Sequence, residues 1–311
     1  MAGLPMCQLG RTGLQVTALG FGAMELRGAP RGRPVQSEQA QAVLNAVLDA
    51  GINYIDTSID YGQSEEFIGQ FIAGRRGEYF LASKCGCLVG APPAPAGQRN
   101  PHDFSRENII AGVNQSLARM KTDYLDVVQF HASPSAETLA QQGAIETLRD
   151  LQREGKVRFI GMSSTLPNID EHVEMGVFDV FQIPYSAADR QHEAVVTRAG
   201  QAGAGVVIRG GVARGAVASE RQASGAAQVW ERAGLDDLLD GMSRQAFMLR
   251  FTLSHPQLDT TIVGTLNPEH LRENLAAAQA GPLPPDTYAE ARRRLEAAGS
   301  APATDAAGRG T

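Results

Sequence analysis

Eight short runs rich in β-branched and aromatic residues alternate with longer stretches of helical hydrophobic periodicity along this chain. Such alternation is typical of a parallel sheet, because each crossover between neighbouring strands carries a helix. Eight strand-helix units close more naturally into a barrel than into an open sheet, so the sequence predicts an α/β fold, a (β/α)8 TIM barrel. The predicted strands are 19–22, 52–55, 79–83, 125–130, 157–162, 180–183, 205–209 and 260–263. The predicted helices include 37–50, 105–120, 142–154, 190–203, 243–254 and 267–279.

The length of the chain agrees with one barrel and short additional ends. Its 311 residues equal about two average domains, but one barrel alone needs about 250 residues. We expect a single barrel domain over 1–298. Segments 7–9 and 14–16 flank a turn and predict a β-hairpin on the barrel floor. The end, 299–311, is mainly Ala, Gly and Thr and is predicted to be a disordered tail, because it buries too little apolar area.

Local signals mark helix starts and two long connections. Ser37 and Ser105 stand at the expected N-caps of two helices, each with a Glu close behind. Segments 88–101 and 210–242 are long connections, on which we expect substrate choice to depend. Trp230, the one Trp of the chain, either covers the site or anchors its connection to a helix.

Charge and cysteine content exclude several classes of protein. The formal net charge is −6, so the chain offers no basic field for nucleic acid or an anionic membrane. It has neither a signal-peptide pattern at its start nor an apolar run of about 18 residues. Three cysteines suit a reducing compartment better than a disulfide framework. We expect a cytoplasmic protein with no nucleic-acid or membrane partner, and the oligomeric state is left open.

Two metal-dependent interpretations are weak at the sequence level. Cys85 and Cys87 could form half a zinc site with His102, but structural zinc needs about four ligands in pairs, and no second pair is present. A metal-dependent barrel hydrolase would place paired histidines at strand ends. The six histidines include no such pair, so the sequence predicts no metal site.

Four polar residues converge at one end of the predicted barrel. Asp56, Lys84 and His131 each follow a predicted strand, and Tyr61 lies five residues after Asp56. The carboxyl ends of barrel strands are where catalytic groups meet. Lys occurs at only three positions in an Arg-rich chain, which indicates that position 84 needs an ammonium whose pKa can be tuned.

A proton-transfer chemistry follows from these four residues. A phenol with a pKa near ~10 is a poor acid at neutral pH until a cation stabilises its phenolate. Lys84 would do this for Tyr61, and Asp56 would hold Lys84 charged and aimed. Singly, Asp56 is more simply a helix cap, His131 a core residue and Tyr61 a packed side chain. Their coincidence on one face favours catalysis.

The sequence around these residues resembles the aldo-keto reductase family. The matching segments are 9–14, 51–57, 61–65, 84, 125–126 with 131, and 271–274. The branch closest in pattern contains potassium-channel β subunits and bacterial general reductases. The resemblance implies reversible hydride transfer from NAD(P)H to an aldehyde, ketone or sugar carbonyl. It assigns Tyr61 as general acid, Lys84 as the group that lowers its pKa, Asp56 as the residue that orients Lys84, and His131 as the group that polarises the carbonyl.

The resemblance also implies a nicotinamide cofactor site. Ser163 and Gln182 match positions that bind the nicotinamide carboxamide, and Ser164 stands where the family usually has Asn. Arg209 falls where an aromatic ring commonly stacks on the nicotinamide, and its charge would disfavour the oxidised ring. Met24 replaces a residue that is often aromatic. The implied cofactor-binding residues are Ala23, Met24, Ser163, Ser164, Gln182, Arg209, Gly211, Gly264, Thr265, His270, Glu273 and Asn274.

His270 bears on the choice between NADPH and NADH. Family members often place an Arg there on the 2′-phosphate, and an imidazole lacks the guanidinium fork. Arg272 points one step away along the predicted helix. We expect NADPH as the cofactor, with NADH possible. The alternative function is a nicotinamide-binding regulatory or assembly subunit with little turnover, since a fold does not guarantee activity.

Overall fold

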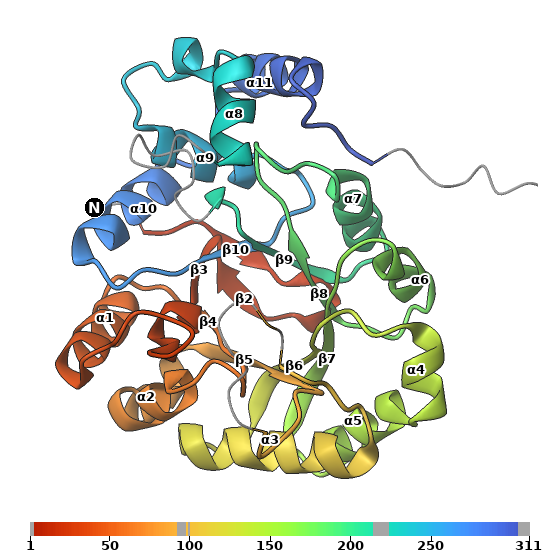
Figure 1. Cartoon of the computed structure of the whole chain (residues 1–311). Coiled ribbons are helices and arrows are strands. Elements are labelled where there is room, and N and C mark those ends of the chain that lie inside the picture. Colours follow the sequence, from red (N-terminus) through yellow and green to blue (C-terminus); the bar gives the residue numbers. More distant parts are fainter. Residues whose placement is uncertain (1–2, 92–97, 99, 214–223, 304–311) are drawn as a thin grey trace, which may run out of the picture.

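The computed structural model is a closed barrel of parallel strands ringed by helices (Figure 1). It describes residues 3–91, 98, 100–213 and 224–303. Around the barrel the strands follow the order β10-β3-β4-β5-β6-β7-β8-β9. The strands are β3 (Leu19–Gly22), β4 (Tyr54–Asp56), β5 (Phe80–Cys85), β6 (Leu125–Phe130), β7 (Val157–Ser163), β8 (Val180–Pro184), β9 (Gly205–Arg209) and β10 (Thr260–Val263). The predicted TIM barrel is confirmed.

Two strands extend further toward the barrel mouth than the sequence predicted. Asp56 is the last residue of β4, where it pairs with Ala82, and Lys84 lies inside β5, where it pairs with Gln129. Both side chains therefore belong to strands and not to the loops that follow. A strand position fixes the backbone through ladder hydrogen bonds on both sides, so these two side chains start from a rigid base.

The helices pack their apolar faces on the outside of the barrel. Their bounds are α1 (Ser37–Asp49), α2 (Ser64–Phe71), α3 (Arg106–Met120), α4 (Ala136–Gln141), α5 (Ala144–Arg153), α6 (Asn168–Glu174), α7 (Glu193–Gln201), α8 (Gly225–Arg232), α9 (Arg244–Leu253), α10 (Pro268–Gln279) and α11 (Pro285–Ala297). Ser105 caps α3 as predicted, accepting the N–H of Asn108. The cap predicted at Ser37 is wrong: α1 begins at Ser37 itself, and the preceding Gln36 makes no side-chain cap bond.

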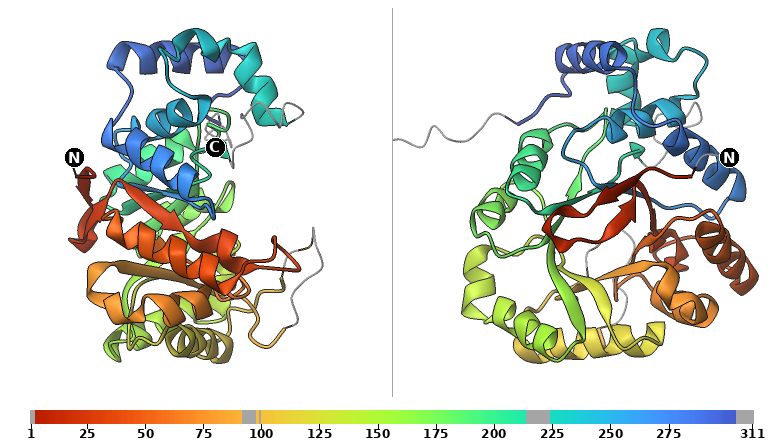
Figure 2. Two further views of the ribbon diagram at one scale, coloured as in Figure 1. Left: turned by 90° about the vertical axis from the view of Figure 1, so that its left-hand side faces the viewer. Right: turned by 180° about the vertical axis from the view of Figure 1, so that it is seen from behind.

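The predicted hairpin closes the floor of the barrel. β1 (Met6–Gln8) and β2 (Gln15–Thr17) pair antiparallel, and Figure 2 shows them across the end of the barrel opposite the long loops. Gly10, with φ of +44°, lies so close to Gly205 that a Cβ would come within 2.2 Å of its backbone nitrogen. Inside the floor lies an apolar cluster of Leu9, Leu14, Val16, Tyr54, Ala82, Val127, Val180 and Val207.

The C-terminal part of the described chain remains packed beyond the boundary expected at 299. The Ser300 hydroxyl donates to the carbonyl of Ala187, and the N–H of Ala303 donates to the carbonyl of Gln191. The rest of the predicted tail, 304–311, lies outside the described residues. Among the described residues, no helix is both long and apolar enough to cross a membrane.

Trp230 anchors α8 to α9 and to the segment that follows α8. Its side chain is buried, stands edge-on to Phe247 and donates its indole N–H to Asp236 over 2.9 Å. Of the two roles left open by the sequence, the anchoring role is the one that these contacts support.

Candidate active site

A buried ion pair lies at the carboxyl ends of β4 and β5. The Lys84 Nζ donates to Asp56 Oδ2 over 2.7 Å and to the carbonyl of Thr57 over 2.8 Å, and both side chains are almost fully buried. Burial by itself would lower the pKa of Lys84, but Asp56 and other nearby groups outweigh it and raise the pKa above the usual value. Lys84 is therefore an ammonium held in place at neutral pH.

Two glutamines complete the surroundings of Asp56. Gln129 of β6 and Gln182 of β8 both donate amide hydrogens to Asp56 Oδ1, over 2.9 and 2.7 Å. The carboxylate thus accepts one charged and two neutral donors, so both of its buried oxygens have hydrogen-bond partners. Sequence reasoning missed Gln129, although a Gln between Val128 and Phe130 in a buried strand is a detectable signal.

Tyr61 lies directly over this ion pair. Lys84 Nζ is 4.9 Å from the centre of the Tyr61 ring. Burial raises the pKa of the phenol above its usual value, while Lys84 pulls it down. Lys84 lowers the pKa of the Tyr61 phenol, as predicted, but burial raises it by more, so the net pKa is above the usual value. The geometry still gives a phenolate at Tyr61 an adjacent cation.

His131 follows β6 and stands edge-on to Tyr61, with 6.2 Å between the ring centres. Burial lowers the pKa of His131 to about 3, against the pull of Asp60. The ring is therefore neutral at physiological pH. Two residues from strands, Asp56 and Lys84, and two from the loops that follow strands, Tyr61 and His131, meet at the mouth of the barrel.

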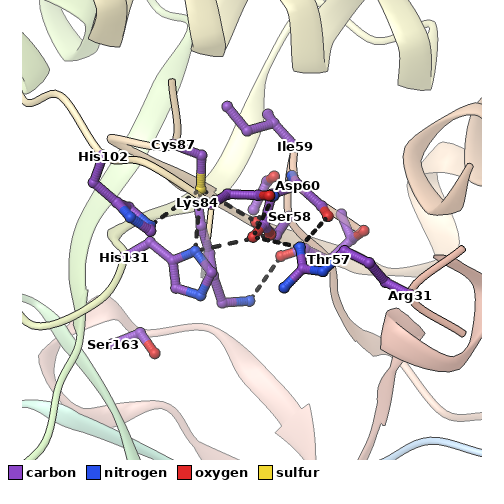
Figure 3. A network of polar contacts seen from close by, with 12 residues as sticks. Arg31, Thr57, Ser58, Ile59, Asp60, Lys84, Cys87, His102, His131 and Ser163 are labelled. Carbon is purple, nitrogen blue, oxygen red and sulfur yellow. Dashed lines mark hydrogen bonds and ion pairs between the residues drawn. The ribbon is translucent and has the colours of Figure 1, made fainter. Parts of the chain in front are cut away.

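The Nδ1 atom of the His131 ring contacts a cysteine (Figure 3). Cys87 Sγ lies 3.1 Å from His131 Nδ1. Burial raises the pKa of the Cys87 thiol, so the thiol is protonated and its S–H can donate to Nδ1. In that arrangement the ring proton of His131 sits on Nε2. The sequence singled out Cys87 only as half of a zinc pair and missed this contact.

Asp60 forms the wall beside these groups. Its carboxylate accepts the Ser58 hydroxyl over 2.8 Å and lies within 3.5 Å of the Arg31 guanidinium (Figure 3). A cavity of about 390 Å³ opens on this side. Asp60 and Cys87 line it together with polar or charged side chains from the segments after β3 and β4, among them Arg27, Arg31, Gln63 and Glu66.

The residues expected at the nicotinamide connect with Asp56. The Ser163 hydroxyl donates to Gln182 Oε1 over 3.1 Å, and Gln182 donates to Asp56. Ser164 has other partners: its hydroxyl lies 2.6 Å from that of Ser133 and 2.9 Å from His172 Nδ1. Of the predicted pair of serines, Ser163 is the one linked to the Asp56–Lys84 ion pair.

Other residues expected to bind the cofactor lie directly after β3 and at the end of β9. Ala23 is buried and Met24 half-buried in the short 3-10 helix after β3. Arg209 ends β9, and its charge acts on both Tyr61 and His131. Gly211 follows it, and a Cβ there would come within 2.7 Å of the Thr261 hydroxyl. At Gly211 the backbone therefore lies too close to Thr261 of β10 to leave room for a side chain.

The segment after β10 leads to a helix with a buried polar atom that has no hydrogen-bond partner among the described residues. Gly264 and Thr265 lead into α10, which begins at Pro268, and Glu273 and His270 are exposed on this helix. Asn274 is buried, and within the described residues its Oδ1 has no hydrogen-bond partner. A buried acceptor without a donor destabilises a protein by about 1–3 kcal/mol. Such an atom fits a ligand that brings an N–H donor, such as the amino group of an adenine ring.

A parallel barrel with a tyrosine, an ammonium and a neutral imidazole at its mouth has the construction of an oxidoreductase that moves a proton as well as a hydride. The Aldo/keto reductase family model matches residues 18–296. The chain therefore belongs to the aldo-keto reductase family, whose members are NAD(P)H-dependent enzymes acting on small-molecule carbonyl or sugar substrates. The match lies within the domain expected over 1–298.

Several full-length relatives support the assignment. The chain is 29% identical over 291 residues to the uncharacterized oxidoreductase YqkF of Bacillus subtilis, covering 88% of this chain and 90% of the relative. It is 27% identical to the NADH-specific methylglyoxal reductase of Escherichia coli, covering 86% and 92%. The crystallised aldo-keto reductase AKR11C1 of Bacillus halodurans, in its holo form, is 29% identical, with a TM-score of 0.81 and 97% of each chain covered.

Proposed function

We propose that the protein reduces a small polar aldehyde or ketone, with Tyr61 as the general acid. The observation that carries the proposal is the buried Asp56–Lys84 pair beneath the Tyr61 ring. A reduced nicotinamide, when bound, would supply the hydride that the carbonyl carbon accepts. The carbonyl oxygen gains negative charge as its double bond is lost, and the Tyr61 hydroxyl transfers its proton to that oxygen. Lys84 stabilises the phenolate that remains, until solvent returns the proton.

His131 serves this reaction as a hydrogen-bond donor and not as the acid. With Nδ1 facing Cys87, Nε2 carries the ring proton and donates to the substrate oxygen. Such a donor stabilises the developing oxyanion without giving up its proton. Tyr61 and His131 together would hold the carbonyl oxygen between them.

The cofactor would lie across the barrel mouth from Ser163 to Asn274. Ser163 and Gln182 offer polar groups suited to the carboxamide, and their link to Asp56 would couple cofactor position to the ion pair. The unpaired Asn274 Oδ1 fits an adenine amine. Gly211, Gly264 and Thr265 would line the path between these ends, with Ala23, Met24, Ser164 and Arg209 forming the surrounding wall and Glu273 the outer edge.

NADPH is the proposed preference, with NADH also accepted. His270 and Arg272 are exposed on α10, where a 2′-phosphate would meet them, but Arg272 already pairs with Glu269 over 2.5 Å. An exposed pair of this kind is weak and can exchange partners. Titration of the protein's fluorescence with both cofactors gives the ratio of affinities. Arg272→Ala should weaken NADPH binding several-fold and leave NADH binding unchanged. An equal loss of affinity for both cofactors would show that Arg272 does not recognise the 2′-phosphate.

A polar substrate suits the cavity beside Asp60. Its lining carries arginines, a glutamate and amides beside apolar side chains such as Ile59 and Val89, and the polar groups match hydroxyl or second carbonyl groups of a substrate. Relatives of this chain are described as an L-galactose dehydrogenase of Arabidopsis thaliana and a methylglyoxal reductase of Escherichia coli. We propose hydroxyaldehydes, oxoaldehydes or sugars as the substrate class, in a reducing compartment such as the cytoplasm, because all three cysteines are free thiols.

The test is cofactor oxidation with a panel of polar and alkyl carbonyls, comparing wild type with Tyr61→Phe. The variant should bind reduced nicotinamide normally and lose turnover by about 10²–10⁴-fold, the usual contribution of a general acid. Tyr54→Phe is the matched control, because the Tyr54 hydroxyl is buried without a partner in the described residues and lies outside the proposed chemistry. Unchanged turnover in Tyr61→Phe would overturn the role of Tyr61, and cofactor binding with little turnover already in the wild type would favour a binding subunit.

A further inference from the structure

Three soft or borderline ligand atoms converge beside the active site. Cys87 Sγ lies 3.7 Å from His102 Nε2 and 3.1 Å from His131 Nδ1 (Figure 3). Within the described residues, one ligand atom from each of the three lies within 4.8 Å of the others. In a tetrahedral zinc site, bond lengths of about 2.3 Å to sulfur and 2.05 Å to nitrogen place the two ligand atoms about 3.6 Å apart. The observed separations bracket that value.

The backbone holds the ligands at this spacing. Cys87 and His102 form an antiparallel bridge, flanked by the hydrogen bonds from Leu88 N–H to Pro101 O and from Asp103 N–H to Gly86 O. Gly86 has a φ of +90°, and a Cβ there would come within 2.2 Å of the Phe104 ring. The glycine therefore lets the chain turn sharply after β5 and present the Cys87 thiol to both histidines.

An ion could reach these ligands and keep an open position. Cys87 lines the cavity of about 390 Å³ next to Asp60. Three protein ligands leave one coordination position for water or a small ligand. A carboxylate lies near one of these ligand atoms, since Asp60 Oδ1 is 3.9 Å from His131 Nδ1, and a nearby carboxylate helps to balance the charge of a bound cation.

We propose that Cys87, His102 and His131 form a binding site for a thiophilic divalent metal ion such as Zn²⁺. Binding forms one metal–sulfur and two metal–nitrogen bonds. It breaks the S–H bond of Cys87, whose proton passes to solvent. The ion takes the place of the thiol as the partner of His131 Nδ1, so His131 keeps its proton on Nε2. The proposal concerns metal binding alone and does not depend on the reductase chemistry.

The test is titration of the reduced, metal-free protein with Co²⁺, whose thiolate charge-transfer and d–d absorption bands report sulfur ligation and tetrahedral geometry. One equivalent of Co²⁺ should produce both bands, and Zn²⁺ should displace it and abolish them. Release of one proton per ion, followed in weakly buffered solution, should accompany binding. An absence of the thiolate band in wild type would overturn the proposal.

Variants identify the ligands. Cys87→Ala should abolish the thiolate band, and His102→Gln should weaken Co²⁺ binding at least 10-fold. Cys7→Ser is the matched control, because Cys7 lies in the floor hairpin and belongs to no such group among the described residues. Circular dichroism establishes that each variant is folded, and His102→Gln, which changes a half-buried loop residue, serves should Cys87→Ala fail to fold. A band that persists in folded Cys87→Ala, or binding unaffected by His102→Gln, would contradict the assignment.

Discussion

The two ends of the barrel are built on opposite principles. The floor is filled by aliphatic side chains from the hairpin and the strands, with Leu9 fully buried among them. The mouth buries an ammonium, a carboxylate and two glutamine amides at the same depth. Apolar burial stabilises a fold by about 25 cal/mol per Å², whereas burying charges is unfavourable unless each is paired.

This contrast separates the residues that stabilise the barrel from the residues that we propose carry out the chemistry. The strands run from one environment to the other: β4 begins with Tyr54 in the apolar floor and ends two residues later with Asp56 in the polar mouth. Substitutions at the floor should therefore change stability without changing chemistry. Substitutions at the mouth should change chemistry, with effects on stability that depend on charge balance.

The largest effect is expected from breaking the ion pair. Lys84→Met leaves Asp56 as a buried charge without its cation, which should reduce stability by about 3–5 kcal/mol, measured by urea unfolding. Turnover should fall by about 10²-fold or more, because Tyr61 loses the cation that stabilises its phenolate.

The double variant Asp56→Asn/Lys84→Met separates these two losses. Asn retains the Oδ1 acceptor for Gln129 and Gln182 and carries no charge, so most of the lost stability should return while turnover stays low. Recovery of turnover in the double variant would show that the pair serves stability alone.

A floor substitution should give the opposite result. Leu9→Ala removes a fully buried side chain that packs against Gly205 and should lower stability by about 2–5 kcal/mol. The kcat of the folded fraction should remain that of wild type, as measured at a temperature where the variant is fully folded. A large loss of kcat in this variant would mean that the floor also positions the catalytic residues.

A smaller effect concerns Asp259, a carboxylic acid that contacts the floor hairpin. Asp259 accepts the N–H groups of Gly10 and Val206, yet burial raises its pKa to about 6. Between pH 4 and 6 the folded protein thus holds a proton that the unfolded chain has released. Stability due to this group falls as pH rises through that window, by at most about 3 kcal/mol. Asp259→Asn should remove that slope from unfolding curves measured across it. An unchanged slope would place the pH dependence elsewhere.

The barrel and the meeting of Asp56, Tyr61, Lys84 and His131 at its mouth could be predicted from the sequence because each leaves a local signal. Strands have a short β-branched pattern, and a charged or polar residue such as Asp56 or Lys84 interrupts that pattern at its end. The family resemblance then linked the residues across the chain. Helix starts were less certain, as the shifted cap at Ser37 shows, since propensity alone rarely fixes a boundary.

The contacts around His131 could not be predicted in the same way. Cys87 and His102 are fifteen residues apart in a Pro- and Gly-rich connection, and only the folded loop brings both to a histidine on another strand. The pKa of Tyr61 was also beyond sequence reasoning: a neighbouring Lys can be inferred from motifs, but the opposing effect of burial depends on the packed structure.

The most direct test of Tyr61 as the acid is the pH dependence of kcat/KM in both directions, carbonyl reduction and alcohol oxidation. Reduction needs the protonated phenol, so its rate should be constant at low pH and fall through one alkaline pKa. Oxidation needs the phenolate, so its rate should rise through the same pKa. His131, with a pKa lowered to about 3, should contribute no inflection near neutrality. A fall in reduction near pH 6.5 that disappears in His131→Gln would contradict the account and assign the proton to the histidine.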